Sequence, residues 1–193
     1  MDALIGVFVG LALSAAVGFR VFVPLLLIGL AARLGYLELT ADMTWLGSDA
    51  ALVALATATV LEVFAYYVPW LDNLLDTIAT PTAVATGAVA WAAVTPELSP
   101  LLRWTLAVVA GGGAAGLVQS STALLRLKSS SFTAGLANPV LATAELAGSL
   151  TLCVVAVLVP VVAAVLVVLL LVGLGCLYRR ATSRRNAAPY SKP

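Results

Sequence analysis

Long apolar runs separated by short polar turns make up most of the chain. An α-helix rises 1.5 Å per residue, so about 20 apolar residues are needed to cross the hydrocarbon core of a bilayer. The runs therefore predict an all-α integral membrane protein. We expect about six transmembrane helices, over residues 3–32, 50–70, 72–94 and 101–125 and, as a pair, within residues 138–178.

Three of these segments do not have the length of one upright span. Residues 3–32 are too long and contain Gly18, Arg20 and Pro24, so we expect this helix to be kinked or broken near Gly18 to Pro24. The third segment is apolar only from residue 81 and reaches spanning length if its helix begins near Asp72. Residues 138–178 have about twice the length of one span and must fold back. Pro160 is the predicted hinge.

Positive charge in the short loops predicts the orientation. The last residues carry five basic side chains, and the loop after the fourth span carries Arg126 and Lys128. Both segments are expected on the cytoplasmic side of the inner membrane, and the acidic loop at residues 33–49 on the outer side. An even number of spans then places the N-terminus in the cytoplasm as well. We expect one transmembrane domain over residues 1–178 and a basic, disordered tail over residues 179–193.

The composition supports the membrane class and excludes several activities. Of 193 residues, 62% are hydrophobic and 10% are charged, whereas a soluble domain has about 25% charged residues. The net charge of +1 gives no reason to expect nucleic-acid binding, and the absence of histidine removes the usual proton switch and most zinc and haem sites. Neither cysteine is near an evident base. We expect no enzyme activity and no cofactor.

A faint internal repeat relates the two halves of the chain. Residues 10–20 resemble residues 112–124, and an Ala-Thr pair precedes both Glu62 and Glu145. Each glutamate falls in the middle span of its half. If each half has three spans, the halves have opposite orientations, as in many secondary transporters. Chance similarity explains the pattern equally well.

Charged residues inside the apolar runs are the first candidates for function, because a charge in a bilayer costs several kcal/mol unless it is paired or hydrated. Glu62 and Glu145 could carry a proton or bind a cation. The alternative is a structural role, in helix–helix hydrogen bonds or in an ion pair with Arg20. Arg20 could likewise pair with a carboxylate or bind an anionic head group or substrate.

A second group of polar residues lies at the start of the third span. Asp72 and Asp76 are four positions apart and share one helical face, with Asn73 beside them. Such oxygen ligands suit Na⁺, Mg²⁺ or Ca²⁺. Acidic capping of a helix N-terminus explains them equally well. Gln119 and Asn138 complete the candidate binding residues, although Asn138 before a proline also has the pattern of a helix start.

Several motifs resemble a family of small bacterial membrane proteins known as domain of unknown function 4126. The most specific is YYVPWLDNLLDTIATP at residues 66–81, and further similarity lies in residues 10–33, 111–119 and 135–145. The resemblance covers roughly residues 10–172. Some members have a lysine near Tyr67 and a histidine near Gln119, which this chain lacks. The resemblance implies the membrane class and supports the choice of polar residues, but it implies no activity.

Together these patterns favour a transporter or permease for an ion or small solute, with membrane-embedded carboxylates as cation or proton sites. An oligomeric channel, a lipid-moving protein and a non-transporting scaffold are the alternatives. The expected partners are the lipid bilayer, a monovalent or divalent cation and, for a channel, further copies of the chain.

Overall fold

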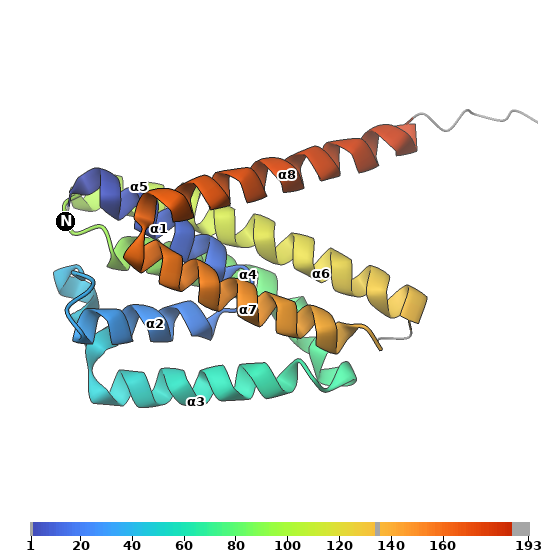
Figure 1. Cartoon of the computed structure of the whole chain (residues 1–193), viewed down its shortest axis with the longest axis horizontal. Helices are drawn as coiled ribbons and strands as arrows, with labels where there is room; N and C mark the ends of the chain where they lie inside the picture. Colours follow the sequence, from blue (N-terminus) through green and yellow to red (C-terminus); the bar gives the residue numbers. More distant parts are fainter. Residues whose placement is uncertain (1, 134–135, 187–193) are drawn as a thin grey trace, which may run out of the picture.

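The structure, a computed structural model, describes residues 2–133 and 136–186. The side chains of residues 69–77, 177, 178 and 180–186 are not described. All regular elements in these residues are helical, which confirms the predicted all-α class (Figure 1). They are α1 (Ala3–Val17), α2 (Phe22–Arg33), the 3₁₀ helix η1 (Ala41–Gly47), α3 (Asp49–Ala65), α4 (Pro69–Ala93), α5 (Pro100–Leu106), the π-helical segment η2 (Ala107–Gly112), α6 (Gly113–Thr133), α7 (Asn138–Leu158) and α8 (Pro160–Asn186).

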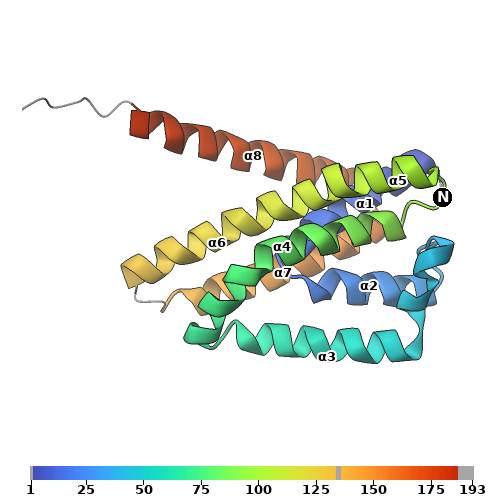
Figure 2. The same ribbon diagram turned by 180° about the vertical axis from the view of Figure 1, so that it is seen from behind.

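The first apolar run forms a helical hairpin. Its helix ends at Val17 and a new helix begins at Phe22, so the expected break near Gly18 is confirmed. Figures 1 and 2 show that α2 then returns to the end of the bundle where α1 begins. The contacts agree. Ser149 of α7 donates a hydrogen bond to the carbonyl oxygen of Ala16, and Leu34, the residue after α2, lines a groove together with Cys153, which lies further along α7. The expectation of one span over residues 3–32 is therefore wrong.

The remaining helices run along the bundle in alternating directions (Figures 1 and 2). The α2–α3 and α4–α5 connections lie at the end that holds Ala3, which we call the N-terminal end. The α3–α4 and α6–α7 connections lie at the opposite end, where α8 finishes, which we call the C-terminal end. The start of α1 and the end of α8 thus lie at opposite ends of the bundle (Figure 1). The location of both termini on the cytoplasmic side stays a prediction.

The apolar helices make this a membrane protein. Within the described residues, two helices are long and apolar enough to cross a membrane by length and composition, Pro100–Thr133 and Asn138–Leu158. A bent pair, Ala41–Gly47 with Asp49–Ala65, would make a third. Four other apolar helices have 10–17 residues, among them the two of the hairpin. The number of six spans stays a prediction.

Several boundaries differ from the predictions. The α5–η2–α6 rod continues to Thr133, so residues 126–133 are helical where a polar loop was expected. The hinge at Pro160 is confirmed, since α7 ends at Leu158 and α8 begins at Pro160. Helix α8 continues to Asn186, into the segment expected to be disordered. Arginine is a good helix former, and positive charge is favourable at a helix C-terminus, so the basic residues extend this helix.

The two segments of the proposed repeat have different structures. Residues 10–20 cover the end of α1 and the hairpin turn, whereas residues 112–124 lie in an uninterrupted helical rod. Gly111, Gly112 and Gly116 of that rod serve close packing against neighbouring helices. A Cβ on Gly111 would lie 2.8 Å from the carbonyl oxygen of Gly87 in α4, so the two backbones touch where the helices cross.

Candidate functional site

The turn of the α1–α2 hairpin places a helix N-terminus inside the bundle. The first backbone N–H groups of a helix have no partner within the helix. Val21 precedes α2 and has no capping side-chain bond. Glu62 of α3 supplies the acceptor: its two carboxylate oxygens accept hydrogen bonds from the backbone N–H of Val21 at 2.8 Å and from that of Phe22 at 3.1 Å. Negative charge at this position is also stabilised by the helix dipole.

A tight turn against α6 holds the hairpin at this depth. A Cβ added to Gly18 would lie only 2.6 Å from the carbonyl oxygen of Ala115 and 2.6 Å from Cβ of Val118. No side chain fits there, so the residue at position 18 must be glycine for the turn to pack on α6. The residue two positions later, Arg20, is then carried into the core.

Arg20 belongs to a buried charge cluster with Arg126 of α6 and Glu145 of α7. Arg126 binds Glu145 with two groups, Nε to Oε1 at 3.1 Å and Nη2 to Oε2. The Nη2 of Arg20 lies 3.6 Å from Oε2 of the same carboxylate and donates to the carbonyl oxygen of Ala142 at 2.7 Å. All three side chains are buried. The ion pair expected for Arg20 is therefore made with Glu145, and Glu62 takes no part in it.

Tyr66 joins the two arginines. It follows the last residue of α3, and the centre of its ring lies 4.0 Å from the Cζ atom of Arg20 and 4.0 Å from that of Arg126. A guanidinium group over an aromatic face is attracted by the ring quadrupole, and more strongly when water is excluded. Tyr66 thus ties the C-terminal end of α3 to the charge cluster.

Sequence reasoning missed both Arg126 and Tyr66. Arg126 was expected in a loop and the aromatic residues near 66 were expected at the membrane interface. A signal for Arg126 was present: Gln119, Thr122 and Arg126 follow a spacing of three and four residues and so share one helical face. All three are buried in α6. No comparable signal marks Tyr66, since its partners come from α1–α2 and α6.

The other candidate residues lie at several places. Gln119 is buried in α6, two turns before Arg126. Asn138 is buried at the start of α7 and donates to Oγ of Ser130 at 3.0 Å. The predicted helix start at Asn138 is confirmed, since α7 begins there, but the N-cap residue is Ala137 and not Asn138.

The predicted cation site falls outside the described side chains. The backbones of Asp72, Asn73 and Asp76 lie in the first two turns of α4, which begins at Pro69. Their side chains are not described, so a metal bound by Asp72 and Asp76 stays a prediction. Within the described part of the chain, no group of three or more histidine, cysteine or acidic side chains is placed to hold a metal ion.

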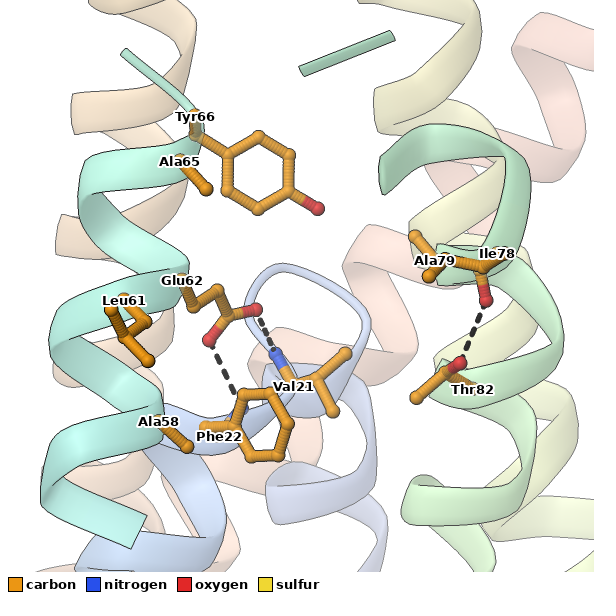
Figure 3. A pocket seen from close by; sticks show the side chains of 10 residues that line it. All are labelled: Val21, Phe22, Ala58, Leu61, Glu62, Ala65, Tyr66, Ile78, Ala79 and Thr82. Atoms are coloured by element: carbon orange, nitrogen blue, oxygen red, sulfur yellow. Dashed lines mark hydrogen bonds between the residues drawn. The ribbon is translucent and has the colours of Figure 1, made fainter. Parts of the chain in front are cut away.

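A cavity of about 390 Å³ reaches Glu62 from between α3 and α4 (Figure 3). Helix α3 packs on α2 and on η1, whereas this groove separates it from α4. Apart from the Glu62 carboxylate and the hydroxyls of Tyr66 and Thr82, the described lining is apolar. It consists of Val21, Phe22, Ala58, Leu61, Glu62, Ala65, Tyr66, Ile78, Ala79 and Thr82.

These features define the class: an all-helical membrane protein with a helical hairpin whose turn meets a buried charge cluster. The chain belongs to the family described as Domain of unknown function (DUF4126), whose profile matches residues 7–180. The resemblance found in the sequence is thus confirmed. No curated protein and no solved structure matches the chain.

Proposed function

We propose that this protein is a permease of the cytoplasmic membrane that carries an ion or a small solute, with Glu62 at the transport site. The observation that supports it most is the cavity of about 390 Å³ that ends at the Glu62 carboxylate. Among the described residues, Glu62 makes hydrogen bonds to two backbone N–H groups and no ion pair. A ligand in the cavity therefore meets the Glu62 carboxylate directly, and a proton or a cation can bind there.

The contacts of Glu62 suggest how binding would change the conformation. The ionised carboxylate holds α3 against the N-terminus of α2 through Val21 and Phe22. A proton or cation on the carboxylate weakens these two bonds, because it withdraws the negative charge that they stabilise. Two states of the α2–α3 contact would then differ in their affinity for the substrate, which is what a transport cycle requires.

Charge at the two ends of the bundle supports one orientation. Lys128 and Arg179 are exposed towards the C-terminal end. At the N-terminal end, Arg33 pairs with Asp49 and Arg103 lies 3.1 Å from Asp42, so the arginines there are neutralised. By the positive-inside rule the C-terminal end is cytoplasmic and the N-terminal end faces outward.

Flux into proteoliposomes tests the proposal. The reconstituted protein is given gradients of H⁺, Na⁺ or K⁺, and internal pH and membrane potential are followed with fluorescent dyes. We expect flux above that of protein-free liposomes, reduced at least about tenfold by Glu62→Gln, which is a change of about 1.4 kcal/mol or more in the barrier. Glu97→Gln is the matched control, because Glu97 is an exposed carboxylate in the α4–α5 connection, at the N-terminal end of the bundle. Equal flux in both variants would remove Glu62 from the site.

A scaffold without transport activity is the second candidate. The observation in its favour is the charge cluster, in which Arg20 and Arg126 both pair with Glu145 and both lie against the ring of Tyr66. Such a cluster stabilises a bundle without any substrate. Folded wild-type protein that supports no flux under any of the gradients would favour this role.

A further inference from the structure

We propose that the groove between α3 and α4 binds a lipophilic organic cation, with Glu62 as its counter-ion. This names the substrate class of the permease proposed above, and it rests on that proposal only for the step of transport. Binding itself is a property of the groove.

The size and the described lining of the groove suit an organic ligand better than a bare metal ion. Its volume of about 390 Å³ is in the range of sites for small organic ligands. A metal ion such as Na⁺ or Ca²⁺ needs several oxygen ligands at close range. The described lining offers the Glu62 carboxylate and two hydroxyls, and the hydroxyl of Thr82 already donates to the carbonyl oxygen of Ile78 at 2.7 Å.

The charge in the groove selects a cation. Glu62 is the one charged group among the described lining residues. Behind the groove, Arg20 and Arg126 carry two positive charges against the single negative charge of Glu145. Neither arginine lines the groove, so the charge that a ligand meets there is the Glu62 carboxylate. A carboxylate can accept about four hydrogen bonds, and only two reach Glu62 from the described residues. An anion would be repelled, and a neutral ligand would remove water from the carboxylate without replacing its interactions.

The mouth of the groove selects an apolar molecule. Leu61 and Ile78 are largely exposed on its two sides, one on α3 and one on α4. The small side chains of Ala58 and Ala65 on α3 and of Ala79 on α4 leave the space between the two helices open (Figure 3). The opening lies on the flank of apolar helices, so a ligand reaches it from the lipid. A cation with a large apolar surface partitions into lipid and gains from burial in this lining.

Binding of tetraphenylphosphonium to the purified protein tests the inference. Equilibrium dialysis with the radiolabelled cation measures affinity in detergent micelles. Two probes separate charge from apolar surface. Tetraphenylborate has the same shape and the opposite charge, and tetramethylammonium has the charge without the phenyl groups. We expect saturable binding of tetraphenylphosphonium alone.

Two variants assign the binding to the groove. Glu62→Gln removes the counter-ion and should weaken binding at least tenfold, whereas Glu97→Gln should leave it unchanged. Ala58→Phe fills the groove and leaves the carboxylate in place, so it should also weaken binding. It decides the question if Glu62→Gln fails to fold. Unchanged affinity in the folded groove variants, or equally tight binding of tetraphenylborate, would overturn the proposal.

The outcomes separate this inference from the proposed function. Flux of an inorganic ion that depends on Glu62, without binding of tetraphenylphosphonium, overturns the ligand class and leaves the permease intact. Binding that depends on Glu62, in a protein that transports neither this cation nor any ion tested, supports the site and contradicts the permease.

Discussion

The two buried glutamates have similar sequence settings and different surroundings. Glu62 and Glu145 are exposed by only 9% and 7%, and an Ala-Thr pair precedes each of them. Glu145 meets two guanidinium groups from other segments. Glu62 meets two backbone N–H groups and an open groove. The difference indicates that Glu145 holds the bundle together, whereas Glu62 remains available to a ligand.

The largest effect is expected for Glu145→Ala. It leaves Arg20 and Arg126 buried without their carboxylate, and removing one partner of a buried ion pair costs about 3–5 kcal/mol. Unfolding by sodium dodecyl sulfate in mixed micelles, followed by circular dichroism, measures the free energy of unfolding. In the control Glu97→Ala the change should stay within about 1 kcal/mol, because Glu97 is exposed and interactions of exposed charges contribute little. A loss in Glu145→Ala as small as that of the control would contradict the structural role of Glu145.

A smaller effect is expected at Tyr66, which links the two regions. Tyr66→Leu removes two cation–π contacts, each of about 0.5–2 kcal/mol, so we expect a loss of about 1–3 kcal/mol in the same assay. Tyr66→Phe keeps the ring and should retain most of this stability. If Phe and Leu destabilise equally, the ring faces do not carry the interaction with Arg20 and Arg126.

The smallest effect on stability is expected for Glu62→Gln. The amide oxygen can still accept one of the two backbone N–H bonds, so the loss should be about 1 kcal/mol. This variant should fold like the wild type and yet lose cation binding. A destabilisation as large as that of Glu145→Ala would show that both glutamates stabilise the bundle, and it would contradict the difference proposed between them.

Local sequence signals predicted part of the site and of the fold. Gly18, Arg20 and Pro24 in one apolar run indicated a broken helix, and Pro160 indicated a hinge, because these residues act on the backbone where they stand. The cost of burying a charge in lipid marked Arg20, Glu62 and Glu145 as residues that need a partner. None of these signals names the partner. Arg20 forms its ion pair with Glu145, which lies 125 positions away in the sequence, and not with Glu62.

By itself, the sequence determined a helical membrane protein of the DUF4126 family and the positions of its interruptions and buried charges. Composition and local backbone chemistry are sufficient for that. Only the tertiary structure decided that α2 turns back, that Arg126 lies inside a helix against Glu145, and that Glu62 faces a groove. A break in a helix allows the chain to change direction, but the new direction depends on packing against helices that are distant in the sequence. Here the contacts of Gly18 with α6 and of Glu62 with the start of α2 support that choice.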